Sequence, residues 1–553
     1  MKKNSLYIVF GLLGTTIVLW QLIASGYVLT LDMVFGPHID LVRNAGDLLN
    51  TAPFWYLLSF LTAILGGWFT QKIVLITIVF SLFYLPLHFY KKIFNVEKTE
   101  GGEYITALFF AINPFVYERF LAGQWMVLLG YVLLVPFTAY LIEFCREWNN
   151  KNGLKLLGII ILMGAISTHY FIISILITSF VLAINFIYHK FSISFLKKSL
   201  ILALSIIVVS SYWIIPAILS KNGPIETFGP EHWEVFKTAT DAHLGTTWNV
   251  LTLHGFWGEH EHWVERFVLP KYFSLSFGIS FTLLLIIIIS GIYFGFKNKR
   301  LRAGVCIAFT IMVLSLIFSS GIADGIFKNL NMWLFENISF WKGFRDSEKW
   351  SAVLVLGYAF FAGFGVQRIL MKFSKVQHAN YKRILFYVFL AIPFLCTPMM
   401  LFGFSGQIKT SQYPESWAQV NNILKTDKDC KALFLPWHQY YSLKFNDSIL
   451  TGNPARSYFD CNILNGKNME LGSIKSQGGN GEEYDLIEKA VINNNEDKDS
   501  INSAIDTLKK DNIKYVIFTD DLISEDVYKY PFIASLRLQM LIKSGDIYLF
   551  KVI

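Results

Sequence analysis

The sequence predicts a polytopic α-helical membrane protein, with about eleven transmembrane helices and a small C-terminal α/β or α+β domain. Two observations place the chain in the membrane. Of its 553 residues, 54% are hydrophobic and only 16% are charged, and the mean hydropathy is +0.45, whereas soluble domains contain about 25% charged residues. Long apolar windows also recur along the first 403 residues. A third observation sets residues 404–553 apart, because short strand-like runs alternate there with polar, helix-compatible stretches.

The apolar windows give the predicted spans in order, and a spanning helix needs about 20 residues. They cover residues 5–26, 72–90, 103–113, 126–144, 154–167, 170–188, 199–216, 273–296, 303–319, 350–371 and 384–403. The windows at 103–113 and 154–167 are the shortest. The first window follows a basic start and is longer than the core of a signal peptide, so we expect an uncleaved signal anchor.

Lysine and arginine residues set the predicted orientation. When the windows are counted in order, the basic clusters all fall in loops on one side of the plasma membrane, for example at Lys91, Lys92, Arg300 and Arg302. The positive-inside rule then predicts a cytoplasmic N-terminus and an external C-terminus. This count requires that the short apolar stretch 53–67 lies along the outer interface instead of crossing.

This orientation divides the chain into a transmembrane domain, 1–403, and an external soluble domain, 404–553. Three loops of the transmembrane domain are also external: 27–71, 217–272 and 320–349. The first of them contains Asp32 and Asp40, close to the end of the first span. Carboxylates at such a position are costly and are usually functional. Asp40 also has a structural interpretation, as the cap of an interfacial helix.

Two further segments place charge at the external rim. The segment "NPFVYERFLAGQW" contains Glu118 and Arg119, which form either a tight outer turn with a local ion pair or a cavity wall that binds an anionic headgroup. Arginine suits a phosphate because its planar fork donates two parallel hydrogen bonds. The segment "GFRDSEKW" adds Arg345 and Lys349, which are either a solvated boundary of the next span or further cations for a phosphate.

His169 and Tyr170 stand where the fifth window turns into the sixth, and the loop "LHGFWGEHEHW" contributes Trp257. We include these three as candidate cavity residues, although a histidine at a helical turn is more often structural. The same loop contains His254, Glu259, His260, Glu261 and His262, whose spacing does not match a helical HExxH zinc motif. We therefore predict neither a metal nor a cofactor.

A nucleic-acid partner is not expected either, since inner-loop lysines and arginines account for the net charge of +8. In the external domain, Cys430 and Cys461 are positioned to form one disulfide if they meet in the fold.

The segments "LTLDMVFGP", "INPFVYERFLAGQWMVLLGY", "SYWIIP" and "FRDSEKW" resemble the GT-C class of polytopic glycosyltransferases. The likeness is to the membrane core of mycobacterial α-(1,3)-arabinofuranosyltransferases. The stretch "LFLPWH…NPARSYF" is similar to the external domain of such proteins and of YfhO-type proteins implicated in glycosylating cell-wall polymers. The resemblance implies a polyprenyl-phosphate sugar donor and a glycan, lipid or protein acceptor at the external face.

The resemblance also implies an essential acidic residue in the first outer loop, and Asp32 occupies the matching place. Many members have paired acidic residues there. Asp32 has no acidic neighbour, and Asp40 is eight residues on, which favours a metal-independent site and leaves open which aspartate is the base.

We therefore expect a membrane glycosyltransferase in which Asp32 is the general base. Arg119, with Arg345 or Lys349, is expected to hold the donor phosphate. The alternatives are a flippase or transporter of lipid-linked sugars, or a catalytically inactive scaffold for cell-envelope assembly. Charge that gathers at the outer rim favours surface chemistry over transport, because transporters place ionisable groups near the midplane.

Overall fold

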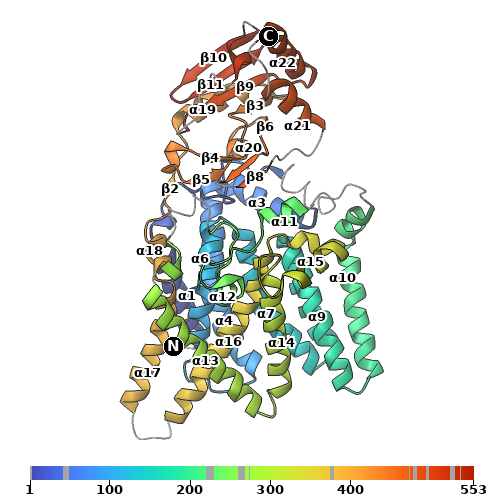
Figure 1. The fold of residues 1–553 in the computed structure, drawn as a ribbon, viewed down its shortest axis with the longest axis vertical. Coiled ribbons are helices and arrows are strands. Elements are labelled where there is room, and N and C mark those ends of the chain that lie inside the picture. Colours follow the sequence, from blue (N-terminus) through green and yellow to red (C-terminus); the bar gives the residue numbers. More distant parts are fainter. Residues whose placement is uncertain are drawn as a thin grey trace.

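The computed structural model contains a bundle of long helices with a sheet domain at one end (Figure 1). It describes residues 3–41, 49–219, 230–259, 268–272, 274–373, 379–471, 474–476, 482–492, 497–522, 530–535 and 537–553. The main helices of the bundle are α1 (Lys3–Leu19), α4 (Gly67–Phe94), α5 (Gly102–Ala111), α6 (Pro114–Leu121), α7 (Trp125–Arg146), α8 (Asn150–Ile166), α9 (Thr168–Tyr188), α10 (Ile193–Leu219), α13 (Ser274–Lys297), α14 (Arg302–Ser319), α16 (Ser351–Phe373) and α17 (Ala379–Cys396).

Among the described residues, eight helices are long and apolar enough to cross a membrane. A ninth span would be the pair Asn380–Cys396 and Pro398–Phe404, which is bent by 78°. The multi-pass fold is thus confirmed, whereas the number of about eleven spans is not. The two shortest predicted windows, 103–113 and 154–167, account for the difference. They correspond to α5, with 10 residues, and α8, with 17, and neither is long enough to be among the candidate spans.

Helix α5 can be short because protein surrounds it. Nine of its ten residues are buried, and it packs between α4 and α16. A helix that does not face lipid need not match the thickness of the bilayer. The side chain of Asn113 accepts a hydrogen bond from the backbone N–H of Val116 and so caps α6. The chain therefore breaks at Asn113-Pro114, where the sequence predicts that the helix ends.

Helices α13 and α16 approach so closely that their backbones touch at two glycines. A Cβ atom on Gly291 would lie 2.0 Å from the carbonyl oxygen of Phe361, and one on Gly365 would lie 2.4 Å from that of Ile287. Small residues commonly allow this kind of packing between membrane helices. The contact fixes α16, whose preceding turns contribute Arg345 and Lys349 to the cavity described below.

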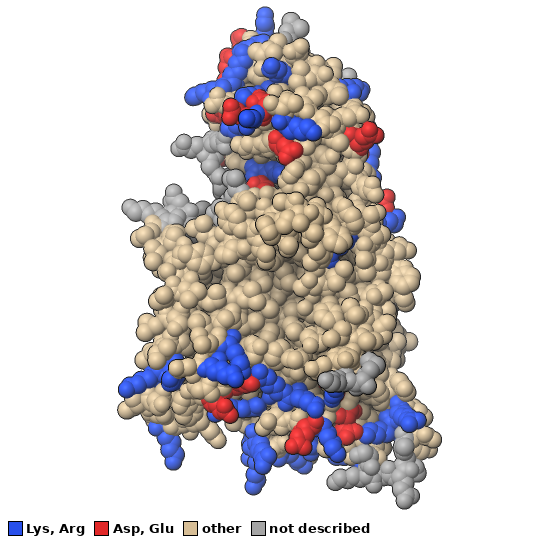
Figure 2. All heavy atoms as spheres, turned by 180° about the vertical axis from the view of Figure 1, so that it is seen from behind, with Lys and Arg blue, Asp and Glu red and all other residues tan. Residues whose placement is uncertain are grey.

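Helix α3 (Ala52–Leu65) lies at the end of the bundle that bears the sheet domain (Figure 1). It has 14 residues and is too short to be a span, and it exposes Leu57, Phe60 and Ile64. It is not among the candidate spans, and its location at the membrane interface stays a prediction. On the face drawn in Figure 2, Lys and Arg gather at the opposite end of the bundle, and few charges lie in the band between.

The C-terminal domain is built on a mixed five-stranded sheet with the strand order β10-β11-β9-β3-β6. Its strands are β3 (Lys431–Leu435), β6 (Asn462–Leu464), β9 (Tyr515–Thr519), β10 (Leu538–Ser544) and β11 (Ile547–Val552). Strands β9, β3 and β6 are parallel, whereas β11 pairs antiparallel with β9, and the edge strand β10 pairs antiparallel with β11. This confirms the predicted α/β character.

Alternate residues of these strands form two cores, as the two-residue period of a strand requires. Phe434 and Ile517 pack in the core that includes α19 (Glu415–Leu424). Leu433 and Val516 pack in the core that includes α22 (Lys498–Lys510). Helix α19 therefore covers one face of the sheet, and α22 together with α21 (Glu482–Ile487) covers the other.

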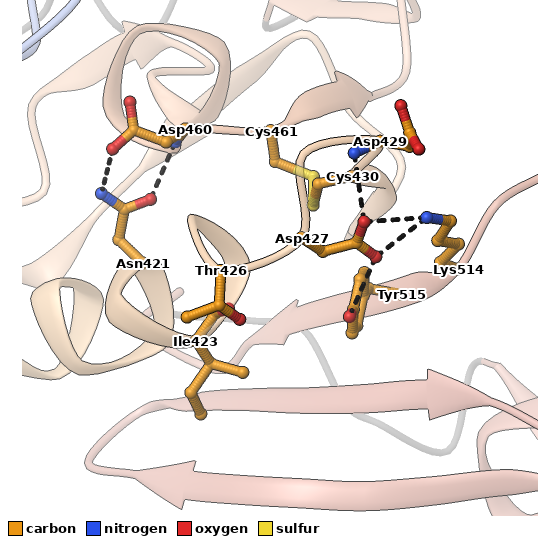
Figure 3. Close-up of a disulfide and its surroundings, with 10 residues drawn as sticks. All are labelled: Asn421, Ile423, Thr426, Asp427, Asp429, Cys430, Asp460, Cys461, Lys514 and Tyr515. Carbon is orange, nitrogen blue, oxygen red and sulfur yellow. Dashed lines mark hydrogen bonds and ion pairs between the residues drawn. A yellow bond between two sulfur atoms is a disulfide. The ribbon is translucent and has the colours of Figure 1, made fainter.

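Cys430 and Cys461 form a disulfide just before β3 and β6, with their Cα atoms 5.0 Å apart (Figure 3). An ion pair between Lys514 and Asp427, at 2.8 Å, lies beside it. The bond joins two adjacent parallel strands at the end where both begin.

Candidate active site

The loop that follows α1 and contains Asp32 is held between the bundle and the C-terminal domain. Strand β1 (Tyr27–Val28) pairs with β2 (Thr410–Ser411), the first strand after the helical bundle. The backbone N–H of Leu31 donates to the carbonyl of Leu450 at 2.8 Å, and that of Gly452 donates to Leu31 at 2.7 Å. The loop is therefore an extra strand segment of the C-terminal domain.

The other side of this loop packs on the turn between α6 and α7. The backbone N–H of Asp32 donates to the carbonyl of Ala122 at 3.1 Å, and the Thr30 hydroxyl donates to that of Leu121 at 2.6 Å. Gly123 adopts a φ of +69°, and a Cβ atom there would lie 2.2 Å from the Thr30 carbonyl oxygen. Glycine is thus required at this position of "LAGQW" because the loop passes directly over it.

The Asp32 carboxylate receives one hydrogen bond from each part of the protein. The Tyr440 hydroxyl donates to Oδ1 at 2.9 Å, and Nε2 of Gln124 donates to Oδ2 at 3.2 Å. The side chain remains open to a cavity, yet the enclosing walls displace water and raise the pKa of the carboxyl. The two hydrogen bonds lower this pKa and so oppose the larger effect of desolvation.

The cavity has a volume of about 550 Å³ and lies where the bundle meets the C-terminal domain. Asp32, Asp40, Arg345, Lys349 and His169, all predicted from the sequence, line it together. The C-terminal domain contributes further polar residues to the wall: Gln439, Tyr440, Asn453 and Arg456. The bundle contributes apolar side chains: Trp55, Trp125, Ile172, Phe340 and Phe344. The side of the C-terminal domain is therefore polar, whereas the side of the bundle combines apolar surface with the charged residues.

Lys349 and Arg345 bring positive charge to this cavity. The Lys349 ammonium lies 3.3 Å from Oδ2 of Asp346 and 3.4 Å from Nε2 of His169. The same ring nitrogen lies 2.9 Å from the carbonyl of Gly343, so we assign it as the N–H that donates there. The Arg345 guanidinium lies over the ring of Phe236 at 4.4 Å, and desolvation lowers its pKa.

Arg119 lies behind the cavity wall and not on it. Its guanidinium is fully buried and binds Asp346 through both oxygens, at 2.6 and 2.9 Å. It also donates to Glu348 and Gln124. Arg119 holds the pKa of Asp346 well below its usual range. These contacts are to protein carboxylates, so Arg119 fixes the segment 345–349 from behind instead of facing a ligand.

Three other predicted residues are also absent from the wall of this cavity. Glu118 is buried with its Oε1 3.9 Å from Nε2 of His254, and burial raises its pKa well above the ordinary value. Tyr170 is buried against Gly130. Trp257 packs edge-on against Phe236, at 5.0 Å between ring centroids, and so supports the ring under Arg345.

The aromatic loop after α12 (Gly245–Leu251) is tied down by its own charges. Glu259 accepts hydrogen bonds from the backbone N–H of Phe256 at 3.1 Å and from Lys271 at 2.6 Å. His260, Glu261 and His262 lie outside the described residues. Within the ranges that the structure describes, no three His, Cys, Asp or Glu side chains come together as metal ligands.

Tyr440, Gln124 and Arg456 were not predicted as site residues. Gln124 had a detectable signal, since it stands in the unusual "GQW" segment. Arg456 stands in "NPARSYF", a segment noted for its resemblance, but nothing there placed it near Asp40. Tyr440 had no signal, because it reaches the cavity only through the docking of the sheet domain on the bundle. Nη1 of Arg456 lies 3.6 Å from Oδ2 of Asp40.

The described helices and the sheet domain define a multi-pass membrane protein whose fold is similar to those of solved membrane proteins. The structure is similar to two cryo-EM structures of the arabinofuranosyltransferase AftD from mycobacteria, with TM-scores of 0.63 and 0.62. The identities are 13% and 14%, and the matches cover 99% of this chain.

This chain spans only about 40% of the length of AftD. It is also similar to the crystal structure of ArnT from Cupriavidus metallidurans, with a TM-score of 0.52 and 10% identity, over 99% of this chain and 97% of ArnT. No protein-family model and no curated protein matches the sequence. At these identities the likeness concerns the fold.

Proposed function

We propose that this chain is a membrane glycosyltransferase that moves a sugar from a polyprenyl-phosphate carrier to an acceptor hydroxyl at the external face. One observation supports this above the others. Asp32 and two cations, Lys349 and Arg345, converge on a single cavity of about 550 Å³. A base for the acceptor and cations for the departing phosphate are the two kinds of charge that this reaction uses.

In this mechanism Asp32 takes the proton of the acceptor hydroxyl, whose oxygen forms a bond to the anomeric carbon of the sugar. The bond between that carbon and the phosphate oxygen breaks, and its electron pair stays on the phosphate. Lys349 and Arg345 stabilise the charge on the polyprenyl phosphate as it leaves. The raised pKa of Asp32 makes it a stronger base, and Tyr440 and Gln124 orient it.

The two walls of the cavity suit the two substrates. Apolar residues such as Trp125 and Phe344 line the side of the bundle, where a lipid carrier would enter from the bilayer. Polar residues such as Asn453 and Arg456 line the side of the C-terminal domain, where a hydrophilic acceptor would approach. The acceptor in this proposal is a glycan, a lipid or a protein of the cell envelope.

The orientation is part of the proposal. The basic end of the bundle in Figure 2 supports a cytoplasmic location for the end opposite the sheet domain. A reporter that is active only in the cytoplasm should be silent when it is fused after Ile553. An active reporter would place the cavity on the cytoplasmic side and would contradict the proposal.

The purified chain in lipid vesicles, supplied with a panel of polyprenyl-phosphate monosaccharides, tests the activity itself. Asp32→Asn is nearly isosteric but cannot accept the proton, so it should reduce transfer by about 10²- to 10⁴-fold and leave polyprenyl-phosphate binding intact. Asp40→Asn should retain partial activity. If the Asp40 variant is inactive and the Asp32 variant is normal, their roles are exchanged.

The same vesicles distinguish the alternatives. A lipid-linked sugar that crosses the bilayer with its glycosidic bond intact would indicate a flippase. A parent protein that neither transfers nor moves any donor of the panel would indicate a scaffold. Transfer by the parent protein together with its loss in Asp32→Asn is the result that we expect.

A further inference from the structure

A second cavity lies between helices of the bundle, and Asp32 is not part of it. It has a volume of about 490 Å³ and is bounded by α9 and α14, with α7 and α16 beneath. Its lining is predominantly apolar, with side chains such as Val181, Ile307 and Phe360. The proposed reaction has no use for this cavity, because its lining shares no residue with that of the first.

The cavity occupies the half of the bundle opposite the C-terminal domain. Helix α7 begins at Trp125 in the wall of the first cavity and ends at Arg146 in the wall of the second. Along α9, the lining runs from Ile177 to Tyr188, which is about 16 Å at 1.5 Å per residue. That length equals about half of a hydrocarbon core that is about 30 Å thick. The cavity thus has the height of one leaflet.

The mouth of this cavity is basic. Arg146, Arg300 and His189 line it where α7 and α9 end and where α14 is about to begin. Its lining contains no aspartate or glutamate among the described residues. Both arginines are exposed. Arg146 also donates to the carbonyls of Lys92 and Ile93, at 3.1 Å each, which fixes its position at the end of α4.

We propose that this cavity binds an anionic diacyl phospholipid of the cytoplasmic leaflet. An acyl chain fills the apolar cleft, and the phosphate lies against Arg146 and Arg300. Three properties together select this ligand: an apolar cleft one leaflet tall, a cationic mouth, and a position at the end of the bundle where lysines and arginines gather (Figure 2). Basic pockets between membrane helices on this side recognise phosphate headgroups in the same way.

Gly304 offers a way to close the cleft without disturbing the bundle. It lines the cavity, and a Cβ atom there would have no neighbour within 4 Å. Gly304→Leu therefore fills part of the cleft. Gly158 on α8 is equally open, with no atom within 4 Å of a Cβ, and does not line the cavity. Gly158→Leu is the matched control.

The test uses the full chain purified in detergent, with phosphatidylglycerol and phosphatidylcholine of identical acyl chains as probes. Native mass spectrometry measures the bound lipid. We expect the parent and Gly158→Leu to bind phosphatidylglycerol at least ten-fold more tightly than phosphatidylcholine. Arg300→Gln should remove most of this preference, and Gly304→Leu should reduce binding of both lipids.

Arg300→Gln is the main headgroup variant, because Arg146→Gln would also remove contacts to α4. Equal binding of the two lipids by the parent would overturn the proposal, as would unchanged binding by Gly304→Leu. A polyprenyl phosphate that displaces phosphatidylglycerol from the parent but not from Gly304→Leu would assign the cleft to the donor carrier and would also overturn it.

Discussion

The hydroxyl of Tyr440 donates a hydrogen bond to Oδ1 of Asp32 at 2.9 Å, although 408 residues separate them in the chain. One residue belongs to the loop that follows α1 and the other to a strand of the C-terminal domain, β4 (Tyr440–Ser442). The candidate base is therefore completed only when the sheet domain is docked. This relationship makes the C-terminal domain part of the proposed active site.

The first prediction concerns the pH dependence of transfer in Tyr440→Phe. The hydrogen bond stabilises the carboxylate and lowers the pKa of Asp32, so its removal raises that pKa. Because the base must be deprotonated, the acid limb of kcat/KM should move to a pH about 1 higher. Tyr548→Phe, which removes a hydroxyl bonded to Asp520 elsewhere in the domain, should leave the profile unchanged. An acid limb at an unchanged pH would show that Tyr440 does not influence the pKa of the catalytic base.

The second prediction concerns Lys349, whose ammonium lines the cavity. Lys349→Gln removes a charge-assisted contact to the phosphate of the carrier. The affinity of the purified chain for polyprenyl phosphate, measured by titration, should fall roughly 10- to 100-fold. Lys342→Gln, a neighbour that does not line the cavity, is the control. Equal affinities of the two variants would exclude Lys349 from the phosphate site.

The third prediction distinguishes support from direct binding at Arg119. Arg119→Ala leaves Asp346 and Glu348 buried without their partner, so it should destabilise the fold by about 3–5 kcal/mol. Thermal unfolding measures this loss, whereas Lys349→Gln should change the midpoint far less. A variant that unfolds normally but no longer binds polyprenyl phosphate would instead make Arg119 a direct ligand, as the sequence alone suggests.

The fourth prediction concerns the disulfide of Figure 3, which closes a loop with a sequence separation of 31. Replacing Cys430 and Cys461 together by serine should destabilise the C-terminal domain by about 3–4 kcal/mol, because the unfolded chain is no longer constrained. Limited proteolysis of the domain reports the change. Cys306→Ser, at a free and exposed cysteine, should have no effect. Equal resistance of all three proteins would show that the bond is not needed for stability.

Sequence patterns alone determined the membrane bundle, the C-terminal sheet domain and the break at Asn113-Pro114. Apolar window length, strand alternation and capping are properties of neighbouring residues, and these hold whatever the rest of the chain does. The same patterns predicted that Asp32, Arg345 and Lys349 lie near helix ends on one side of the membrane. The structure gathers these three residues in one cavity.

Tertiary structure decided the rest, because it depends on which surfaces meet. The short helix α5 is enclosed by protein, and Arg119 pairs with Asp346 behind the cavity wall. Tyr440 and Arg456 contact Asp32 and Asp40, respectively, in the loop that follows α1. A guanidinium near a membrane surface has the same sequence signal whether its partner is a protein carboxylate or a lipid phosphate. Only the packing of α6 against the turn before α16 distinguishes them, since that packing buries the charge among carboxylates.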